Sequence, residues 1–145
     1  MSSRTIVAGV DGSEGSAGAV AWCAATAPLL DAEEVAVFVI EPLVAFVPPT
    51  TPVPVVDEHE HERMRKALEE EWCAPLHDAG VPFRTEVLDG TPADALIGIA
   101  EQLDADLVVV GRRGHGGLSE LLLGSAARAL AHRCPRPVVI VPATG

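Results

Sequence analysis

Two hydrophobic periodicities alternate along the chain and predict strands separated by helices. Five short apolar runs, several of them rich in Val and Ile, are typical of strands when both faces of their sheet are covered. These runs are residues 5–10, 35–40, 83–88, 107–110 and Val138–Val141. Between them, apolar residues recur every three or four positions, which is the period of an amphipathic helix. The order predicts an α/β fold with a five-stranded parallel sheet, right-handed crossovers and helices on both faces.

Capping residues and prolines agree with these predicted helices. Ser13 is placed to cap the first helix, and Thr91 precedes a proline at the first position of another. Gly80 follows the second helix where a C-terminal glycine belongs. Pro75 lies inside the pattern of that second helix, so we expect a kink or break near Ala74.

Residues 42–57 interrupt the alternation with a proline-rich segment. Its prolines stand at positions 42, 48, 49, 52 and 54. Because proline cannot donate to a sheet ladder, the segment is unsuitable as a central strand, and it is long for a connection between a strand and a helix. We therefore expect an exposed excursion, which would be either a solvated loop without a role or a partial lid over a ligand.

Length and charge narrow the classes of function. The chain has 145 residues and a mass of 15.1 kDa, so we expect residues 1–145 to form one domain. Ten Lys and Arg against 21 Asp and Glu give a net charge of −11. A molecule this acidic repels nucleic-acid backbones and anionic membrane surfaces, so we expect neither as a partner. Any phosphate ligand must therefore be held by a local site.

The cysteines and the N-terminus favour the cytoplasm. Cys23, Cys73 and Cys134 are widely separated, with no C-x-x-C pair and no spacing typical of zinc ligands. Their odd number fits a reducing compartment. The first residues show no signal-peptide pattern, and no run approaches the ~18 apolar residues of a membrane span. We expect a soluble cytoplasmic protein.

A glycine-rich loop after the fourth predicted strand is the main candidate site, because parallel α/β sheets bind ligands at the carboxyl ends of their strands. It has no G-x-G-x-x-G fingerprint, and the only lysine, Lys66, lies in a helix, which excludes a Walker P-loop. Positive φ at its glycines would turn several N–H groups toward one anion. The loop residues are Gly111, Arg112, Arg113, Gly114, His115, Gly116 and Gly117.

The start of the last helix completes this predicted phosphate cradle. Gly124 and Ser125 open that helix, whose unpaired N–H groups and positive dipole end favour a phosphate. Arg112 and Arg113 add fixed positive charge, and His115 would either contact a phosphate or be exposed. The alternative is a tight turn with close packing and no ligand.

Asp11, at the end of the first predicted strand, would lie beside this cradle. Its carboxylate could receive a ribose hydroxyl or orient the hydration shell of Mg²⁺ next to the phosphates. Alternatively, it accepts N–H bonds in a turn before the first helix, and the two roles are compatible. A base would lie against Val10 and Val39.

Other candidates for chemistry are weaker. Alternating Glu and His at positions 58–62 suggest metal ligands, but alternate residues do not share a helix face, so a solvated first helical turn is the better interpretation. No Ser/His/Asp or Cys/His arrangement has catalytic spacing, and no general base is placed against the predicted phosphates. The sequence therefore favours binding over catalysis.

Three segments resemble the universal stress protein family. They are residues 7–13, Val-Ala-Gly-Val-Asp-Gly-Ser; residues 105–111, Ala-Asp-Leu-Val-Val-Val-Gly; and the pattern Gly111-x2-Gly114-x9-Gly124-Ser125. The last pattern marks the family's ATP-binding subclass, and the resemblance covers essentially the whole chain. It implies a Rossmann-like, adenine nucleotide α-hydrolase-like sheet of order 3-2-1-4-5. It also implies a homodimer paired along Val138–Val141.

The resemblance also implies a binding site for ATP with Mg²⁺. The phosphates would meet Gly111, Gly114, Gly124 and Ser125, Asp11 would serve the ribose or the metal, and the adenine would lie near Val39. The full expected set is Gly9, Val10, Asp11, Ser13, Val39, Gly111, Arg112, Arg113, Gly114, His115, Gly116, Gly117, Gly124, Ser125 and Ala126. Ala127 departs from the many members that keep a hydroxyl two residues beyond the serine, which removes one phosphate contact.

The function expected from these observations is that of a non-enzymatic, ATP-binding regulator in a stress response, whose nucleotide changes the surface that a protein partner meets. A slow ATPase or a phosphoryl- or adenylyl-transfer enzyme is the alternative, opposed by the missing base and the missing Walker lysine. A dimeric scaffold without nucleotide is a third. The apolar edge at Val138–Val141 favours a two-fold dimer, unless Pro137 and Pro142 guard it in a monomer.

Overall fold

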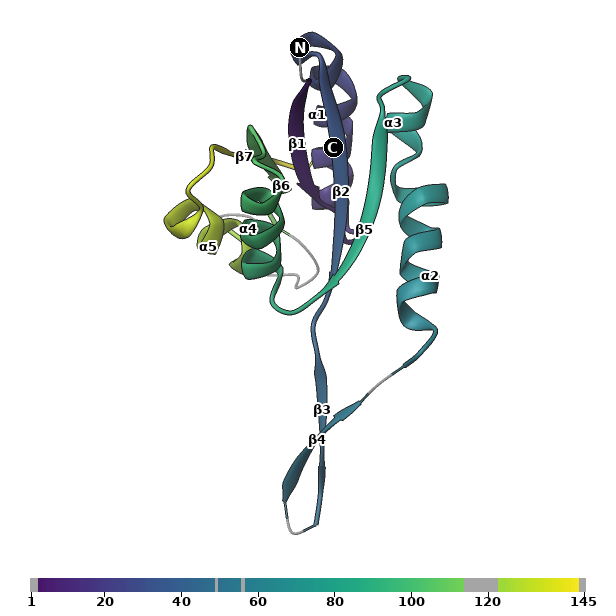
Figure 1. The fold of residues 1–145 in the computed structure, drawn as a ribbon, viewed down its shortest axis with the longest axis vertical. Coiled ribbons are helices and arrows are strands. Elements are labelled where there is room, and N and C mark those ends of the chain that lie inside the picture. Colours follow the sequence, from purple (N-terminus) through teal and green to yellow (C-terminus); the bar gives the residue numbers. More distant parts are fainter. Residues whose placement is uncertain (1–2, 49, 56, 114–122, 144–145) are drawn as a thin grey trace.

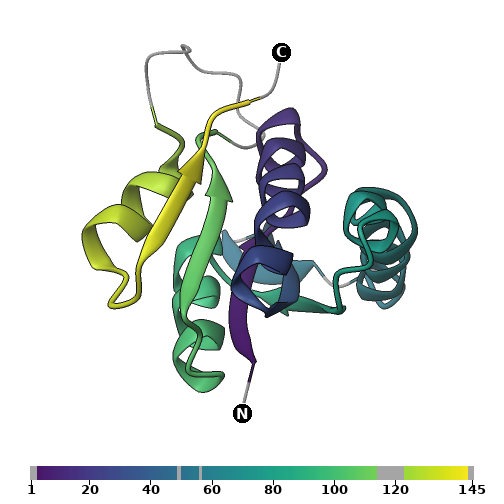
Figure 2. The same cartoon turned by 90° about the horizontal axis from the view of Figure 1, so that it is seen from above.

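A parallel sheet at the centre of the molecule confirms the predicted architecture. The computed structural model describes residues 3–48, 50–55, 57–113 and 123–143. The sheet comprises β1 (Arg4–Gly9), β2 (Ala32–Ile40), β5 (Phe83–Asp89), β6 (Leu107–Gly111) and β7 (Val138–Val141). Its order is β5-β2-β1-β6-β7, with every neighbouring pair parallel (Figures 1 and 2). This is the predicted order 3-2-1-4-5, and its direction reverses between β1 and β6.

Helices cover both faces of the sheet, as Figure 2 shows. One layer contains α1 (Glu14–Leu30), α2 (Glu60–Ala67), the π-helix η1 (Leu68–Trp72) and α3 (Ala74–Asp78); the other contains α4 (Pro92–Gln102) and α5 (Ser125–Arg133). Alternate residues of β1 serve the two layers: Ile6 and Ala8 pack with α1, and Val7 packs with α4 and α5. This two-sided burial explains the continuous apolar runs of the strands.

The predicted break in the second helix occurs where Pro75 requires it. The helical hydrogen bonding shifts to a π-turn, in which the Cys73 N–H donates to the Leu68 carbonyl at 3.0 Å. Cys73 itself leaves helical geometry, with φ −98° and ψ 13°, and α3 then restarts with Pro75 in its first turn. Because a first-turn proline needs no N–H donor, the restart accommodates it.

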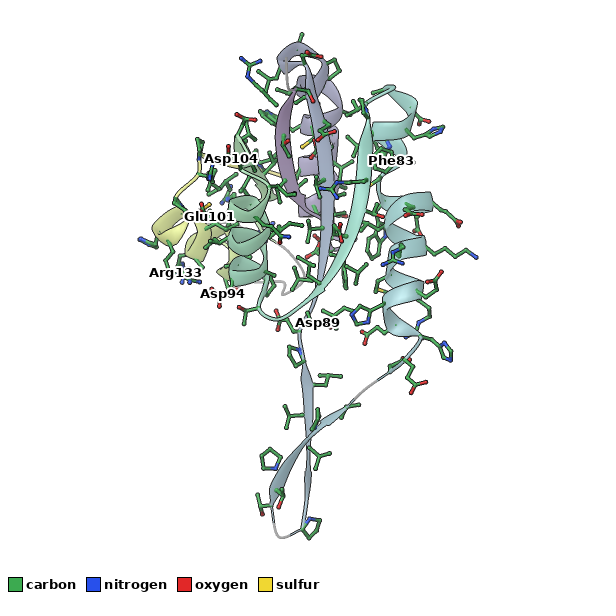
Figure 3. The ribbon with its side chains drawn as sticks, viewed as in Figure 1. Phe83, Asp89, Asp94, Glu101, Asp104 and Arg133 are labelled. Carbon is green, nitrogen blue, oxygen red and sulfur yellow. The ribbon has the colours of Figure 1, made fainter. Side chains whose placement is uncertain are left out.

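The helix caps are partly as predicted. Ser13 caps α1, and its Oγ accepts from the Ser16 N–H at 3.2 Å. Thr91 precedes α4 but makes no backbone cap bond, because its hydroxyl donates to Asp94 Oδ2 at 2.8 Å. The other oxygen of Asp94 accepts from Arg133 of α5 at 2.8 Å, and Figure 3 shows the two side chains together. This ion pair ties α4 to α5.

The proline-rich segment forms an antiparallel hairpin of β3 (Leu43–Val47) and β4 (Thr51–Val55). It makes a separate two-stranded sheet that projects from the carboxyl end of β2, well away from the body of the molecule (Figure 1). The expected exposed excursion is therefore confirmed. Its strands were not predicted, because the alternating prolines hide the strand pattern.

No helix in the described residues is long and apolar enough to cross a membrane.

Candidate functional site

A cleft of about 380 Å³ opens at the carboxyl ends of β1, β2 and β6, beside the point where the strand order reverses. Among the residues predicted for the site, those that line it are Gly9, Val10, Asp11, Ser13, Val39, Gly111, Arg113, Gly124, Ser125 and Ala126. Ligands of open α/β sheets bind in such a crevice. None of the described residues of the β3–β4 hairpin lines it.

Arg112 holds the base of the predicted phosphate loop together rather than lining the cleft. Its N–H donates to the carbonyl of Val141 at 2.8 Å, and its carbonyl accepts from the Gly124 N–H at 2.8 Å. These two bonds join the end of β6 to the end of β7 and to the start of α5. The predicted residues Gly114, His115, Gly116 and Gly117 lie outside the described residues.

The turn after β1 fixes Asp11 at the cleft. Ser13 donates to Asp11 Oδ1 from its N–H, at 2.9 Å, and from its hydroxyl. The Asp11 N–H in turn donates to Ser16 Oγ at 3.2 Å. The turn-and-cap role considered for Asp11 is therefore present. Because this network orients the carboxylate before any ligand arrives, it does not compete with a ligand-binding role.

Trp72 supports the same turn from behind. Gly12 has φ +81°, and a Cβ there would lie 2.6 Å from Trp72 Cζ2. The indole also packs against Phe38, with ring centroids 5.7 Å apart, and Phe38 lines the cleft. Trp72 is the last residue of the π-helix η1. The irregular helix thus places a large aromatic ring directly under the Asp11 turn.

Gly111 is required for close packing, which corrects one expectation. Its φ is not among the positive values, so the predicted left-handed conformation is wrong at this residue. A Cβ at Gly111 would instead lie 2.4 Å from the carbonyl carbon and oxygen of Gly15, and a Cβ at Gly15 would lie 1.8 Å from the carbonyl oxygen of Arg113. The two glycines let the strand end cross the first turn of α1 in backbone contact.

The N-terminus of α5 faces the cleft. Gly124 is its N-cap residue, and glycine has no side chain that could accept from the first N–H groups. Ser125, Ala126 and Ala127 of its first turn all line the cleft. Amide groups that lack an intrahelical partner, together with the helix dipole, make this end favourable for an anion. Ala127 is buried and offers no hydroxyl there.

Sequence reasoning found Val10 and Val39 of the apolar wall and missed the rest of it, together with one carboxylate. Phe38 and Leu96 form part of the lining, together with Ser16, and Glu41 lies at the end of β2. Glu41 could have been found, because it follows a strand at its carboxyl end as Asp11 does. Leu96 carried no such signal, since in the sequence it is one of several apolar positions of a helix.

Within the described residues, no group of three or more His, Cys, Asp or Glu side chains is arranged to hold a metal ion.

The profile of the universal stress protein family matches residues 2–142. The chain belongs to this family. It is 36% identical over 142 residues to a universal stress protein of Mycolicibacterium smegmatis, a match that covers 94% of the chain and 47% of that protein. It is 34% identical over 150 residues to one of Methanocaldococcus jannaschii, covering 95% of the chain and 81% of the relative. The chain thus spans about half the length of the mycobacterial relative.

Solved universal stress protein structures share the fold. A universal stress protein in complex with cAMP superposes with a TM-score of 0.73 at 26% identity, covering 99% of this chain and 100% of the other. The universal stress protein of Archaeoglobus fulgidus in complex with dAMP gives a TM-score of 0.70 at 19% identity, covering 97% and 99%. The Rossmann-like fold and the family resemblance are therefore confirmed.

Proposed function

We propose that this universal stress protein binds an adenine nucleotide in the cleft at the carboxyl ends of β1, β2 and β6. The observation that carries the proposal is the convergence of the Asp11 turn, the Gly111 crossing and the N-terminus of α5 on one cavity. Two solved relatives bind cAMP and dAMP, and both ligands consist of adenine, a pentose and one phosphate.

The chemistry of the cleft favours one orientation. The base would lie against Val10, Val39 and the ring of Phe38, and Asp11 would accept from a ribose hydroxyl. The phosphates would meet the first turn of α5, Gly111 and Arg113, where the local positive potential opposes the acidic charge of the whole chain. The G-x2-G-x9-G-S pattern extends this to ATP with Mg²⁺ as the ligand we propose.

We infer a regulatory role for this binding, in the cytoplasm. The protein would act as a homodimer through β7, which is an edge strand of the sheet and contains only Val and Ile. Occupancy of the cleft would change the surface that a protein partner meets. Binding stabilises the folded state by RT ln(1 + [L]/Kd), about 2.7 kcal/mol at a hundredfold excess of ligand.

Ala126→Glu tests the site without harming the fold. A carboxylate in the first turn of α5 complements the helix dipole, so stability is maintained, but it repels the phosphates of a bound nucleotide. We expect the affinity for Mg-ATP, measured by titration calorimetry, to fall by roughly tenfold or more, as a like-charge contact of ~1–2 kcal/mol requires.

Gly98→Glu is the matched control, because it adds the same charge on the exposed side of α4, where a Cβ meets nothing within 4 Å. Equal affinities of the two variants would contradict the placement of the phosphates. Titrations of the native protein with AMP, ADP and ATP, each with a timed assay for ADP formation, separate a binding protein from a slow ATPase. No heat and no thermal shift with any of them would leave the scaffold hypothesis.

A further inference from the structure

The β3–β4 hairpin, which we call the arm, carries an unusual apolar surface. Apart from Leu29, the exposed large apolar side chains in the described residues all belong to it: Leu43 is 70% exposed, Val44 51%, Val53 39% and Val55 53%. Residues 42–56 contain no charged side chain, in a chain whose net charge is −11. Figure 1 shows that the arm extends beyond the body of the molecule, with no helix against it.

Both faces of the arm are apolar. Cross-strand partners share a face, so the register places Leu43 and Val55 together, with Val53 on the same side, and places Val44 with Pro54 on the other. An isolated two-stranded ribbon is marginally stable in water and requires further strands or a packed layer. Among the described residues of a single copy the arm has neither, so its fold calls for a covering surface.

The two edges of the arm differ. Pro52 and Pro54 have no N–H, so the hydrogen bonds from β4 to β3 must come from the alternate residues of β4. The backbone nitrogens of both prolines therefore point to the outer edge of the arm, where they cannot donate. That edge is blocked. Strand β3 has no proline, and by the same alternation the N–H and C=O groups of Val44 and Phe46 face outward. The arm therefore presents one pairing edge.

We infer that β3 pairs antiparallel with β3 of a second copy of this chain, which joins two arms into a four-stranded sheet. A two-fold axis beside Ala45 brings Val44 of each copy opposite Phe46 of the other, so the outward-facing groups of both strands bond reciprocally. The exposed apolar faces of the two arms then become continuous. The blocked β4 strands form the outer edges of the new sheet, which ends the pairing there.

The uncharged arm allows a second copy to be the partner despite the acidic charge of the chain. Two copies of the chain that each carry a net charge of −11 repel one another. The arm has no charged residue and projects from the body, so two arms can contact each other while the acidic bodies stay apart. The contact is small, because the arm has ten strand residues, against the roughly 20–30 residues that each partner brings to a standard interface. Arm pairing is therefore weak alone and gains strength where another contact, such as the proposed β7 pairing, already links two chains.

The base of the arm is fixed to the body, which limits the cost of ordering it. Arg63 of α2 binds Asp57, two residues beyond β4, at 2.8 Å, and the Gly90 N–H donates to the carbonyl of Ile40, the last residue of β2, at 3.0 Å. Figure 3 places Asp89 beside the start of the arm. The arm is thus tied to the body on both sides of its base.

Amide hydrogen exchange of the full chain tests the pairing directly. In the native protein at high concentration, we expect the Val44 and Phe46 amides to exchange roughly tenfold or more slowly than unprotected amides, and to lose this protection on dilution. The Val53 and Val55 amides, which bond within the arm, serve as internal references. Fast exchange of Val44 and Phe46 at high concentration, or protection that dilution does not change, would overturn the proposal.

Val44→Pro supplies the matching variant, because it blocks the edge of β3 as Pro52 and Pro54 block β4, at a position where no ladder bond is lost. Val44→Thr is the control, since it keeps the shape and the N–H. Sedimentation equilibrium should show weaker association for the proline variant alone. Association unchanged in Val44→Pro, or weakened equally by both substitutions, would refute pairing through the strand edge. The nucleotide affinity of both variants should equal that of the native protein, which separates this test from that of the cleft.

Discussion

Glu34 is a buried acid whose protonation links stability to pH. It lies in β2 between Ile6 of β1 and Phe83 of β5, and its side chain is 0% exposed. Neither carboxyl oxygen has a hydrogen-bond partner of normal geometry among the described residues. Burial raises the pKa of the carboxyl from 4.5 to about 7, although the adjacent Cys23 thiol acts in the opposite direction. The native state therefore keeps a proton at pH values where the unfolded chain has lost it.

The sign and size of the effect follow from this difference in pKa. The contribution of Glu34 to the free energy of unfolding is greatest below pH 4.5, the pKa of the carboxyl in the unfolded chain. It falls as the pH rises toward about 7, where the native carboxyl also ionises. At 1.36 kcal/mol per pKa unit, the free energy of unfolding falls by about 2.5 kcal/mol between pH 5 and pH 8 on account of this residue alone. That is a large share of the ~5–15 kcal/mol that stabilises a domain.

Denaturant unfolding at pH 5 and pH 8, followed by tryptophan fluorescence, measures this loss. Glu34→Gln keeps the side-chain volume and removes the titration. Between pH 5 and pH 8 the free energy of unfolding of this variant should therefore fall by ~2.5 kcal/mol less than that of the native protein. Glu33→Gln is the matched control, because Glu33 is the neighbouring exposed residue and should behave as the native protein does. Parallel changes in the native protein and Glu34→Gln would refute the reasoning. Glu34→Met, which also removes the buried polar group, should be more stable than the native protein at pH 8.

Two glycine-to-alanine substitutions should have opposite effects on thermal unfolding. Gly98 lies inside α4, and a Cβ there meets nothing within 4 Å, so Gly98→Ala should stabilise by ~0.5–1 kcal/mol, or about 2–4 °C in Tm per kcal/mol. Gly111→Ala should destabilise by ~1–3 kcal/mol, because its Cβ would lie 2.4 Å from the backbone of Gly15. An unchanged Tm for Gly111→Ala would show that the strand end does not cross α1 so closely, and a lower Tm for Gly98→Ala would show that the outer face of α4 is covered.

Most of the sheet could be predicted because its signals are local. The runs at residues 35–40 and Val138–Val141 owe their apolar character to helices on both faces of the sheet. In the structure their side chains pack into both layers of the core. The start of the first helix at Ser13 and the break at Pro75 depend on hydrogen-bonding groups a few residues away. The carboxyl ends of the strands are fixed by the same local pattern, which is why Asp11 could be placed at the cleft.

What escaped prediction depends on partners distant in the chain. Glu34 gives no local sign of burial: it follows Glu33, and the two read as a polar pair at the start of a strand, although only Glu33 is exposed. The difference arises because β2 lies inside the sheet, where the side of the strand that carries Glu34 faces α1 and Cys23. The arm escaped for another reason, since its prolines break the alternating pattern while leaving the ladder intact.

Gly111 shows most clearly that the residue type alone does not reveal why a glycine is required at a position. In a loop that follows a strand, a glycine suggests a left-handed turn. A glycine at the same position is equally required where another backbone segment passes too close to leave room for a Cβ. Only the position of Gly15, in the first turn of α1, decides between the two. The distinction matters for the cleft, because a turn can rearrange around a ligand, whereas a backbone crossing holds the end of β6 and the start of α1 at one fixed separation.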